Sequence, residues 1–341
     1  MKYQLKFSIC MPVYNGASVI RPTLQSVLSQ SFTNYDLIIV DDCSKDETER
    51  LVTSFKDKRI KFFRNQKNLG YSKNLEECRK KASGDIIYLM GQDDILAKDA
   101  LLNTYKAFLT SSDIGAVARP YFWFDKDIKR PVRAKEQLNS KKDEIIRIID
   151  DKNKIITLFS TLDQLSGLAL RRKYIDMPFH EDIFPCHVYP FASIFKKHPV
   201  VFLKDYNVAV RIGSSQSRNA PIYCRKTSYI YDKSPIQSWV DMFKNVFYET
   251  EFDKFRGYMI KNFVAKNYVG LVQIKNYAKY KYLLREIMML LKYRWQNIYN
   301  PQFWIFSIGS IITPPVMLIP LVDWYKNNVN SRRLKDIKFQ Y

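Results

Sequence analysis

Short apolar runs alternate with amphipathic segments over roughly the first third of the chain. Five runs rich in Ile, Val, Phe and Tyr predict β-strands, namely Lys6–Val13, Tyr35–Val40, Ile60–Arg64, Asp85–Met90 and Gly115–Phe122. Four segments between them predict helices, namely Thr23–Gln30, Asp46–Phe55, Ser72–Lys81 and Lys98–Leu109. This alternation indicates an α/β fold, a doubly wound and mostly parallel sheet with helices on both faces.

The rest of the chain follows a different pattern. Residues 125–150 are rich in charged side chains, which favours a surface excursion, and residues 155–212 mix strand-like and helix-like segments. From about residue 236 to residue 295 the apolar positions recur at helical spacing, for example at Trp239, Phe243 and Phe247. We therefore expect a helical region after the α/β part.

One long uncharged stretch, Phe303–Val322, lies near the end of the sequence. Its 20 residues could span about 30 Å of hydrocarbon as one helix, but Pro314, Pro315 and Pro320 would interrupt that helix. Basic residues flank the stretch on both sides: Lys292, Arg294, Lys326, Arg332, Arg333, Lys335 and Lys338. A broken apolar segment between cations is typical of an element that lies on, or re-enters, an anionic membrane surface.

The overall composition supports an ordered protein with an anionic partner. Apolar residues make up 46% of the chain, which excludes a disordered or collagen-like protein, and the net charge is +21. Residues 253–341 hold 15 Lys and Arg against 4 Asp and Glu, whereas residues 1–100 hold 16 against 13. The charge is thus concentrated beside the apolar stretch, as expected for a membrane surface.

The five cysteines are widely separated and include no CxxC pair, which argues against a zinc site or a disulfide scaffold. The N-terminal residues lack an apolar signal core, so we expect a reduced, cytoplasmic protein. No helix-turn-helix, zinc-finger or RNP pattern accompanies the positive charge, which argues against nucleic-acid binding, the alternative from a different functional class.

Polar clusters follow each of the first four predicted strands: Pro12–Gly16, Asp41–Ser44, Asn68–Asn74 and Gly91–Asp94. In a doubly wound sheet, ligands bind at the carboxyl ends of the strands, so these clusters should meet at one edge. Adjacent carboxylates repel each other unless a cation neutralises them. Mg²⁺ or Mn²⁺ commonly bridges such carboxylates to a substrate diphosphate.

The ordered segments MPVYNG, IIVDDCS, NLGYSKNLE and YLMGQDDIL resemble family 2 glycosyltransferases of the GT-A fold over about residues 5–110, and more loosely to about residue 215. The resemblance implies that Asp41 hydrogen-bonds the base, typically uracil. It implies a nucleotide and donor-sugar site formed by Pro12, Tyr14, Asn15, Asp41, Asn68, Gly70, Asn74, Asp93 and Arg211. Asp94 would hold Mg²⁺ or Mn²⁺ on the diphosphate, with Asp93 as a possible second ligand. Relatives often carry an acid where Gly91 stands, so the metal site relies more heavily on Asp94.

The family's reaction is an inverting single displacement, in which a carboxylate takes the proton of the acceptor hydroxyl. In relatives this base is usually the Asp of a Glu-Asp pair. Glu181-Asp182 matches that pair, and we assign Asp182 as the base, with Glu181 as one alternative. An ungapped alignment on the following helix instead puts Cys186-His187 at this place, so His187 is the alternative base.

The resemblance also suggests a division of the chain and a substrate class. Residues 1–115 would bind the nucleotide sugar, 116–220 the acceptor and catalytic residues, 221–300 would form a helical region, and 301–341 a membrane-associating tail. The expected reaction transfers a sugar from a nucleotide sugar, UDP being the commonest carrier, to a glycan or lipid-linked glycan acceptor. We expect a peripheral or monotopic protein at the inner face of the cell membrane, and the oligomeric state stays undetermined.

Three other enzyme classes share parts of this pattern. A polyprenyl-phosphate sugar synthase remains an alternative, because it would use the same donor site and a lipid acceptor. A processive polysaccharide synthase is disfavoured, because Leu291–Trp295 lacks the Gln of the QxxRW motif. A dinucleotide-dependent dehydrogenase is disfavoured by the absence of GxGxxG after the first strand.

Overall fold

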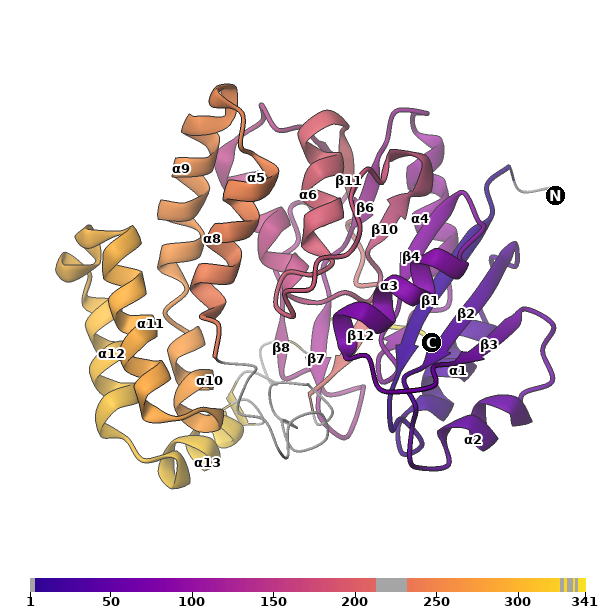
Figure 1. Ribbon diagram of the computed structural model, residues 1–341, viewed down its shortest axis with the longest axis horizontal. Coiled ribbons are helices and arrows are strands. Elements are labelled where there is room, and N and C mark those ends of the chain that lie inside the picture. The colour runs from indigo at the N-terminus through magenta and orange to yellow at the C-terminus, as the bar shows by residue number, and fades with distance from the viewer. Residues whose placement is uncertain (1–3, 213–231, 326–327, 330–333, 335–336) are drawn as a thin grey trace. The chain divides into compact units, whose positions relative to one another are not determined.

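The computed structural model describes residues 4–212, 232–325, 328–329, 334 and 337–341 (Figure 1). The chain forms two compact units. The first consists of residues 1–214 together with residues 334–341, and the second of residues 215–333. The polypeptide therefore leaves the first unit, builds the second, and returns to the first. The functional division at residues 115, 220 and 300 remains a prediction.

An eight-stranded sheet runs through the first unit in the order β3-β2-β1-β4-β10-β6-β11-β9. Its strands are β1 (Phe7–Val13), β2 (Tyr35–Asp41), β3 (Ile60–Arg64), β4 (Ile86–Leu89), β6 (Ala116–Ala118), β9 (Glu144–Ile146), β10 (Ala169–Arg171) and β11 (Val200–Phe202). The first four are mutually parallel, whereas β10 is antiparallel to β4 and β6. Every residue of β1 and β2 is buried, as expected for strands covered on both faces.

Helices cover both faces of this sheet, which confirms the predicted α/β architecture. α1 (Ile20–Leu28), α2 (Thr48–Ser54) and α4 (Ala100–Leu109) share one core with Phe7, Ile9 and Met11 of β1. α3 (Tyr71–Lys81) packs on β1 and β2, where its buried Cys78 lies near Cys10 (Figure 1). α5 (Lys152–Ser160) and α6 (Val188–Lys197) pack through a ring cluster of Phe159, Phe191 and Phe195.

The prediction of one strand over Gly115–Phe122 was wrong. The segment forms β6 and then β7 (Phe122–Phe124), which belong to different sheets. Pro120 lies between them, and because proline has no N–H to donate, it removes a hydrogen bond of the sheet at the point where the segment divides. β7 joins a second sheet in the order β5-β12-β7-β8, with β5 (Ile95–Leu96), β12 (Val208–Arg211) and β8 (Arg133–Ala134).

The charged segment 125–150 is more than a surface excursion. It contributes β8 to the small sheet and β9 to the edge of the large one. Val132 and Ile146 within it are buried, so a few apolar side chains fix an otherwise polar segment to both sheets.

The second unit is helical, as predicted. Its helices are α8 (Pro235–Val246), α9 (Asp253–Asn262), α10 (Gly270–Tyr277), α11 (Tyr280–Tyr293), α12 (Pro301–Ile312) and α13 (Pro315–Tyr325). The apolar stripe of α8 is part of its core, with Phe243 fully buried against the rings of Phe247, Phe255 and Phe263. Short 3₁₀ helices occur in the first unit at Thr161–Asp163 and Arg172–Tyr174. In the second unit they occur at Thr250–Phe252, Val264–Lys266 and Trp295–Tyr299.

The long apolar stretch forms two short helices, α12 and α13, which are separated at Thr313-Pro314. Pro315 begins α13 and Pro320 lies within it, so the break predicted from the prolines occurs at the first pair. Among the described residues, none of the helices has the length and apolar character needed to cross a bilayer. Of the flanking cations, Lys326, Arg332, Arg333 and Lys335 lie outside the described residues.

Candidate active site

Side-chain hydrogen bonds join the loops that follow β1, β2 and β4. The amide side chain of Gln92 accepts from Tyr14 N at 2.9 Å and donates to Tyr14 O at 3.2 Å. Asn15, in the left-handed region at φ 47°, donates its backbone N–H to Ser44 Oγ at 2.8 Å, and its Oδ1 accepts from Lys45 N at 2.8 Å. These bonds show that three strand ends meet at one edge of the sheet, as predicted.

Asp41 lies at the end of β2 and is fully buried. Its carboxylate accepts from the hydroxyl and backbone N–H of Ser44, and Arg64 Nη1 lies 3.6 Å from Oδ2. Burial raises the pKa of Asp41 above its usual range, against the opposing effect of these donors. Pro12 is also buried, whereas Tyr14 and Asn15 are half-buried at the same edge.

Asp42 and Asn74 organise the loop between β3 and α3. The buried Asp42 carboxylate accepts from Asn65 Nδ2, Leu69 N and Gly70 N at 2.8–2.9 Å. Asn74 is also buried, and its amide donates to Val40 O at 2.9 Å. Asn74 thus ties α3 to the end of β2, while Asn68 is exposed and accepts from Gly70 N at 3.1 Å.

Asp94 is the buried acid of the loop after β4. Its Oδ1 accepts from Arg211 N at 3.1 Å, and its Oδ2 accepts from the hydroxyl of Ser166. Burial raises the pKa of Asp94 well above its usual range, and the neighbouring charge of Asp93 raises it further. The Arg211 guanidinium donates to Asp93 O at 3.4 Å and lies over the Phe124 ring. The structure therefore brings Asp93, Asp94 and Arg211 together.

Gly91 lies close to the side-chain oxygens of this loop. A Cβ at Gly91 would lie 3.1 Å from Asp93 Oδ1, Asp94 Oδ2 and Ser166 Oγ. Oxygens of both carboxylates therefore converge on one point, and a side chain at position 91 would crowd them. Hard oxygen donors suit Mg²⁺ or Mn²⁺. The described residues contain no cluster of three or more His, Cys, Asp or Glu side chains placed for a metal.

Ser166 and Arg119 are site residues that the sequence analysis missed. Ser166 Oγ accepts from Gly91 N at 2.8 Å while it donates to Asp94. The fully buried Arg119 donates to the backbone carbonyls of Ser166, Thr161 and Gln164. These bonds hold the 161–166 segment against the Asp94 loop. The sequence held one signal of this role, because Arg119 is the only charged residue of the predicted strand Gly115–Phe122.

The segment with the candidate bases lies beside α3. Glu76 Oε2 accepts from Phe179 N at 3.1 Å, and the exposed Glu181 pairs with Lys73 at 3.4 Å. Asp182 is 9% exposed.

His187 is buried, with Nε2 2.8 Å from Leu162 O. Because a carbonyl oxygen only accepts, Nε2 carries the proton in that bond. Burial lowers the pKa of His187 to about 4. Its Nδ1 lies 3.8 Å from Cys186 Sγ.

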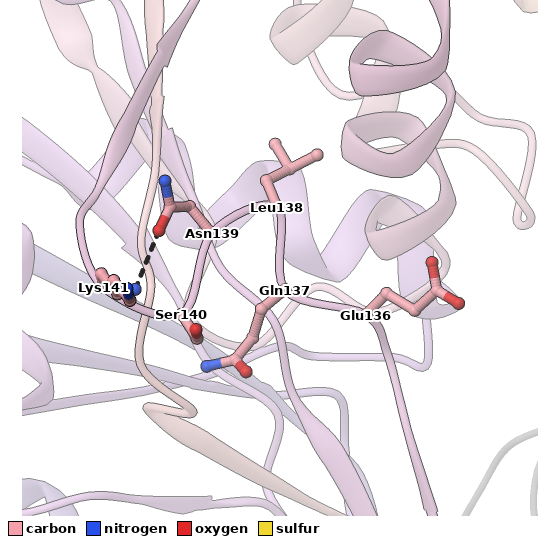
Figure 2. Close-up of a pocket in the computed structure, with 6 residues that line it drawn as sticks. All are labelled: Glu136, Gln137, Leu138, Asn139, Ser140 and Lys141. Carbon is pink, nitrogen blue, oxygen red and sulfur yellow. Dashed lines mark hydrogen bonds between the residues drawn. The ribbon is translucent and has the colours of Figure 1, made fainter.

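A shallow hollow lies on the first unit beside residues 136–141, where Asn139 Oδ1 accepts from Lys141 N (Figure 2). None of the predicted site residues lines it. The candidate site is therefore defined by the network at the strand ends.

Comparison with known proteins agrees with this arrangement. The family model "Glycosyl transferase family 2" matches residues 8–177. The Escherichia coli "UDP-Glc:alpha-D-GlcNAc-diphosphoundecaprenol beta-1,3-glucosyltransferase WfgD" is 39% identical over 88 residues, which are 26% of this chain and 35% of that protein. The chain thus matches about a third of that relative's length.

Two solved structures share the fold. S. aureus TarS 1–349 in complex with UDP-GlcNAc has a TM-score of 0.64 at 15% identity, over 97% of this chain and 90% of that one. The mannosyltransferase PcManGT from Pyrobaculum calidifontis, in complex with GDP-Man and Mn²⁺, has a TM-score of 0.53 at 15% identity, over 91% and 87%. At these identities, the likeness shows the fold alone.

The loop network leads to a stability prediction for Asp42. In Asp42→Asn, an amide NH₂ replaces one carboxylate oxygen, so at least one of the backbone N–H groups of Leu69 and Gly70 loses its hydrogen bond to residue 42. We expect the free energy of unfolding to fall by about 2–3 kcal/mol, measured by urea denaturation. The exposed Asp127→Asn should change it by less than about 0.5 kcal/mol. Equal effects of the two substitutions would contradict the assigned role.

Proposed function

We propose that this chain, which belongs to glycosyl transferase family 2 through residues 8–177, moves a sugar from a nucleotide diphosphate to a glycan or polyprenyl-linked acceptor at the inner face of the cell membrane. The observation that carries the proposal is the hydrogen-bonded meeting of the Tyr14, Asp41 and Asp94 loops at the strand ends. UDP is the proposed carrier, which is consistent with the UDP-GlcNAc complex of TarS and the UDP-Glc in the name of WfgD.

In the proposed complex the nucleoside lies against Pro12, Tyr14 and Asn15. Asp41 would hydrogen-bond the base through a lone pair that its bonds with Ser44 leave over. Asn68 and Gly70 flank the donor from the loop before α3. Asn74 supports this loop from inside, because its amide is already bonded to Val40 O.

The diphosphate would lie at Asp93, Asp94 and Arg211. Asp94, with Asp93, would hold Mg²⁺ or Mn²⁺, which neutralises charge on the leaving diphosphate when it is bound. Arg211 supplies a fixed positive charge beside the same carboxylates. Ser166 orients the Asp94 carboxylate, and Gly91 leaves room for it.

Asp182 is the proposed general base. It would accept the proton of the acceptor hydroxyl while that oxygen attacks the anomeric carbon from the face opposite the diphosphate, which inverts the configuration. Glu181 is more exposed and is paired with Lys73. His187 is buried and bonded to Leu162 O, which supports Asp182 over it.

The surface of α12 and α13 supports a lipid-linked acceptor. α12 buries Ser307 and Ser310, whereas it exposes Ile305, Ile308 and Ile312. A helix at a water-facing protein surface has the opposite pattern, with its polar side chains exposed and its apolar ones buried. α13 is apolar and has no buried residue, with Val316 77% exposed. Together with the excess of Lys and Arg in residues 253–341, this apolar face fits an anionic bilayer surface.

The metal assignment predicts the behaviour of Asp94→Asn. An amide is a weaker ligand than a carboxylate, so Mn²⁺-dependent binding of UDP, measured by calorimetry, should weaken about a hundredfold or more. The variant should stay folded, because an amide oxygen can still accept from Arg211 N. Unchanged Mn²⁺-dependent binding would rule out Asp94 as the ligand.

The base assignment predicts a separation between chemistry and donor binding. In Asp182→Asn, kcat should fall by about 10²–10⁴-fold, while the dissociation constant for the donor changes little. His187→Gln tests the alternative, and we expect it to reduce stability with a smaller loss of kcat. If the His187 variant shows the separation and the Asp182 variant does not, His187 is the base.

The membrane proposal predicts that the apolar face of α12 is needed for lipid binding. The triple variant Ile305→Ser, Ile308→Ser, Ile312→Ser should no longer float with vesicles of phosphatidylglycerol and phosphatidylethanolamine, although it still binds UDP. Ile149→Ser is the matched control, because Ile149 is 82% exposed on the first unit. Flotation of the triple variant at the wild-type level would contradict the proposal.

A further inference from the structure

The small sheet β5-β12-β7-β8 has two apolar faces. Trp123, Val208 and Val210 on one face belong to the main core of the first unit. The other face carries Ile95, Phe122, Phe124 and Ala209, which form a separate cluster. Each of these four residues is no more than 3% exposed. Other chain segments must therefore cover the second face.

Residues 337–341 provide part of that cover. Ile337 and Phe339 pack against the cluster, and the rings of Phe339 and Phe122 meet edge-on with their centroids 5.0 Å apart. The backbone adds a hydrogen bond of 2.7 Å from Lys98 N to Gln340 O. This segment follows the whole second unit in the sequence, yet it belongs to the first unit.

The covered face of the small sheet also carries Arg211, a residue of the candidate site. β12 pairs with β7 so that Ala209 lies beside Phe122 and Arg211 beside Phe124. The Arg211 guanidinium lies 4.7 Å from the centre of the Phe124 ring, on the covered face of the sheet. The backbone N–H of Arg211 donates to Asp94, and β5 begins at the next residue, Ile95. The small sheet thus supports both Arg211 and Asp94.

We propose that Phe339 is a positioning residue for the diphosphate site: by packing on Phe122 it holds the small sheet in the arrangement that aligns Arg211 with Asp94. This inference rests on the proposed function, because it assumes that Arg211 and Asp94 bind a diphosphate. Phe339 would act through Phe122 and the small sheet rather than by contact with the substrates. Its removal would leave Phe122 and Phe124 without one side of their packing, and the β7–β12 pair could then shift.

The decisive readout separates the diphosphate from the nucleoside. In the full-length Phe339→Ala variant, affinity for UDP with Mn²⁺, measured by calorimetry, should fall about tenfold or more. Affinity for uridine, measured by saturation-transfer NMR, should stay within about twofold, because the Tyr14 and Asp41 loops follow β1 and β2 of the eight-stranded sheet. The matched control is Lys338→Ala, which removes an exposed neighbouring side chain and should leave both affinities unchanged.

Two further variants distinguish positioning from general damage to the fold. Phe339→Leu keeps much of the packing and should recover most of the UDP affinity. A chain without residues 337–341 should lose UDP affinity, and an added peptide of residues 334–341 should restore it. Equal UDP affinity in the wild type and Phe339→Ala, or parallel losses for UDP and uridine, would overturn this inference alone. A wild type that binds no UDP with Mn²⁺ would overturn the proposed function as well.

Discussion

The hydrogen bonds between the loops at the strand ends are the constraint on which the site depends. Parallel strands bring their carboxyl ends to one edge of the sheet. In the loops beyond them, the backbone N–H and C=O groups have no neighbouring strand with which to form hydrogen bonds. The side chains of Gln92, Ser44 and Asp42 supply those partners. Each of them accepts a hydrogen bond from a backbone N–H of a different loop from its own. The loops therefore form one hydrogen-bonded assembly at this edge of the sheet.

The same assembly holds two buried acids, Asp41 and Asp94, of which Asp94 is the proposed ligand of a cation. Burial disfavours the charged carboxylates of Asp41 and Asp94, and the proximity of Asp93 adds repulsion at Asp94. Ser44, Ser166 and the backbone of Arg211 provide donors that partly offset this cost. A divalent cation with a diphosphate would offset the rest, which is why we connect this edge with sugar transfer from a nucleotide.

Local sequence was sufficient to predict the helices of the first 110 residues, their strands except β5, and the edge where the polar clusters meet, because apolar periodicity and parallel topology determine them. It failed where distant segments take part. Ser166 reaches Asp94 from a segment more than seventy positions later, and the burial of His187 follows from tertiary packing. Pro120 was a visible signal that the strand over residues 115–122 would divide. The role of residues 337–341 had no local signal, since only the fold brings Phe339 to Phe122.

The central claim is that Asp94 and its neighbours hold a metal on the diphosphate of a nucleotide. Anomalous diffraction at the manganese edge, from crystals grown with MnCl₂ and UDP, tests it most directly. The account predicts a manganese peak in direct contact with an Asp94 carboxylate oxygen and with phosphate oxygens of the nucleotide. Bound UDP with its phosphates remote from Asp94, or manganese bound elsewhere, would contradict it.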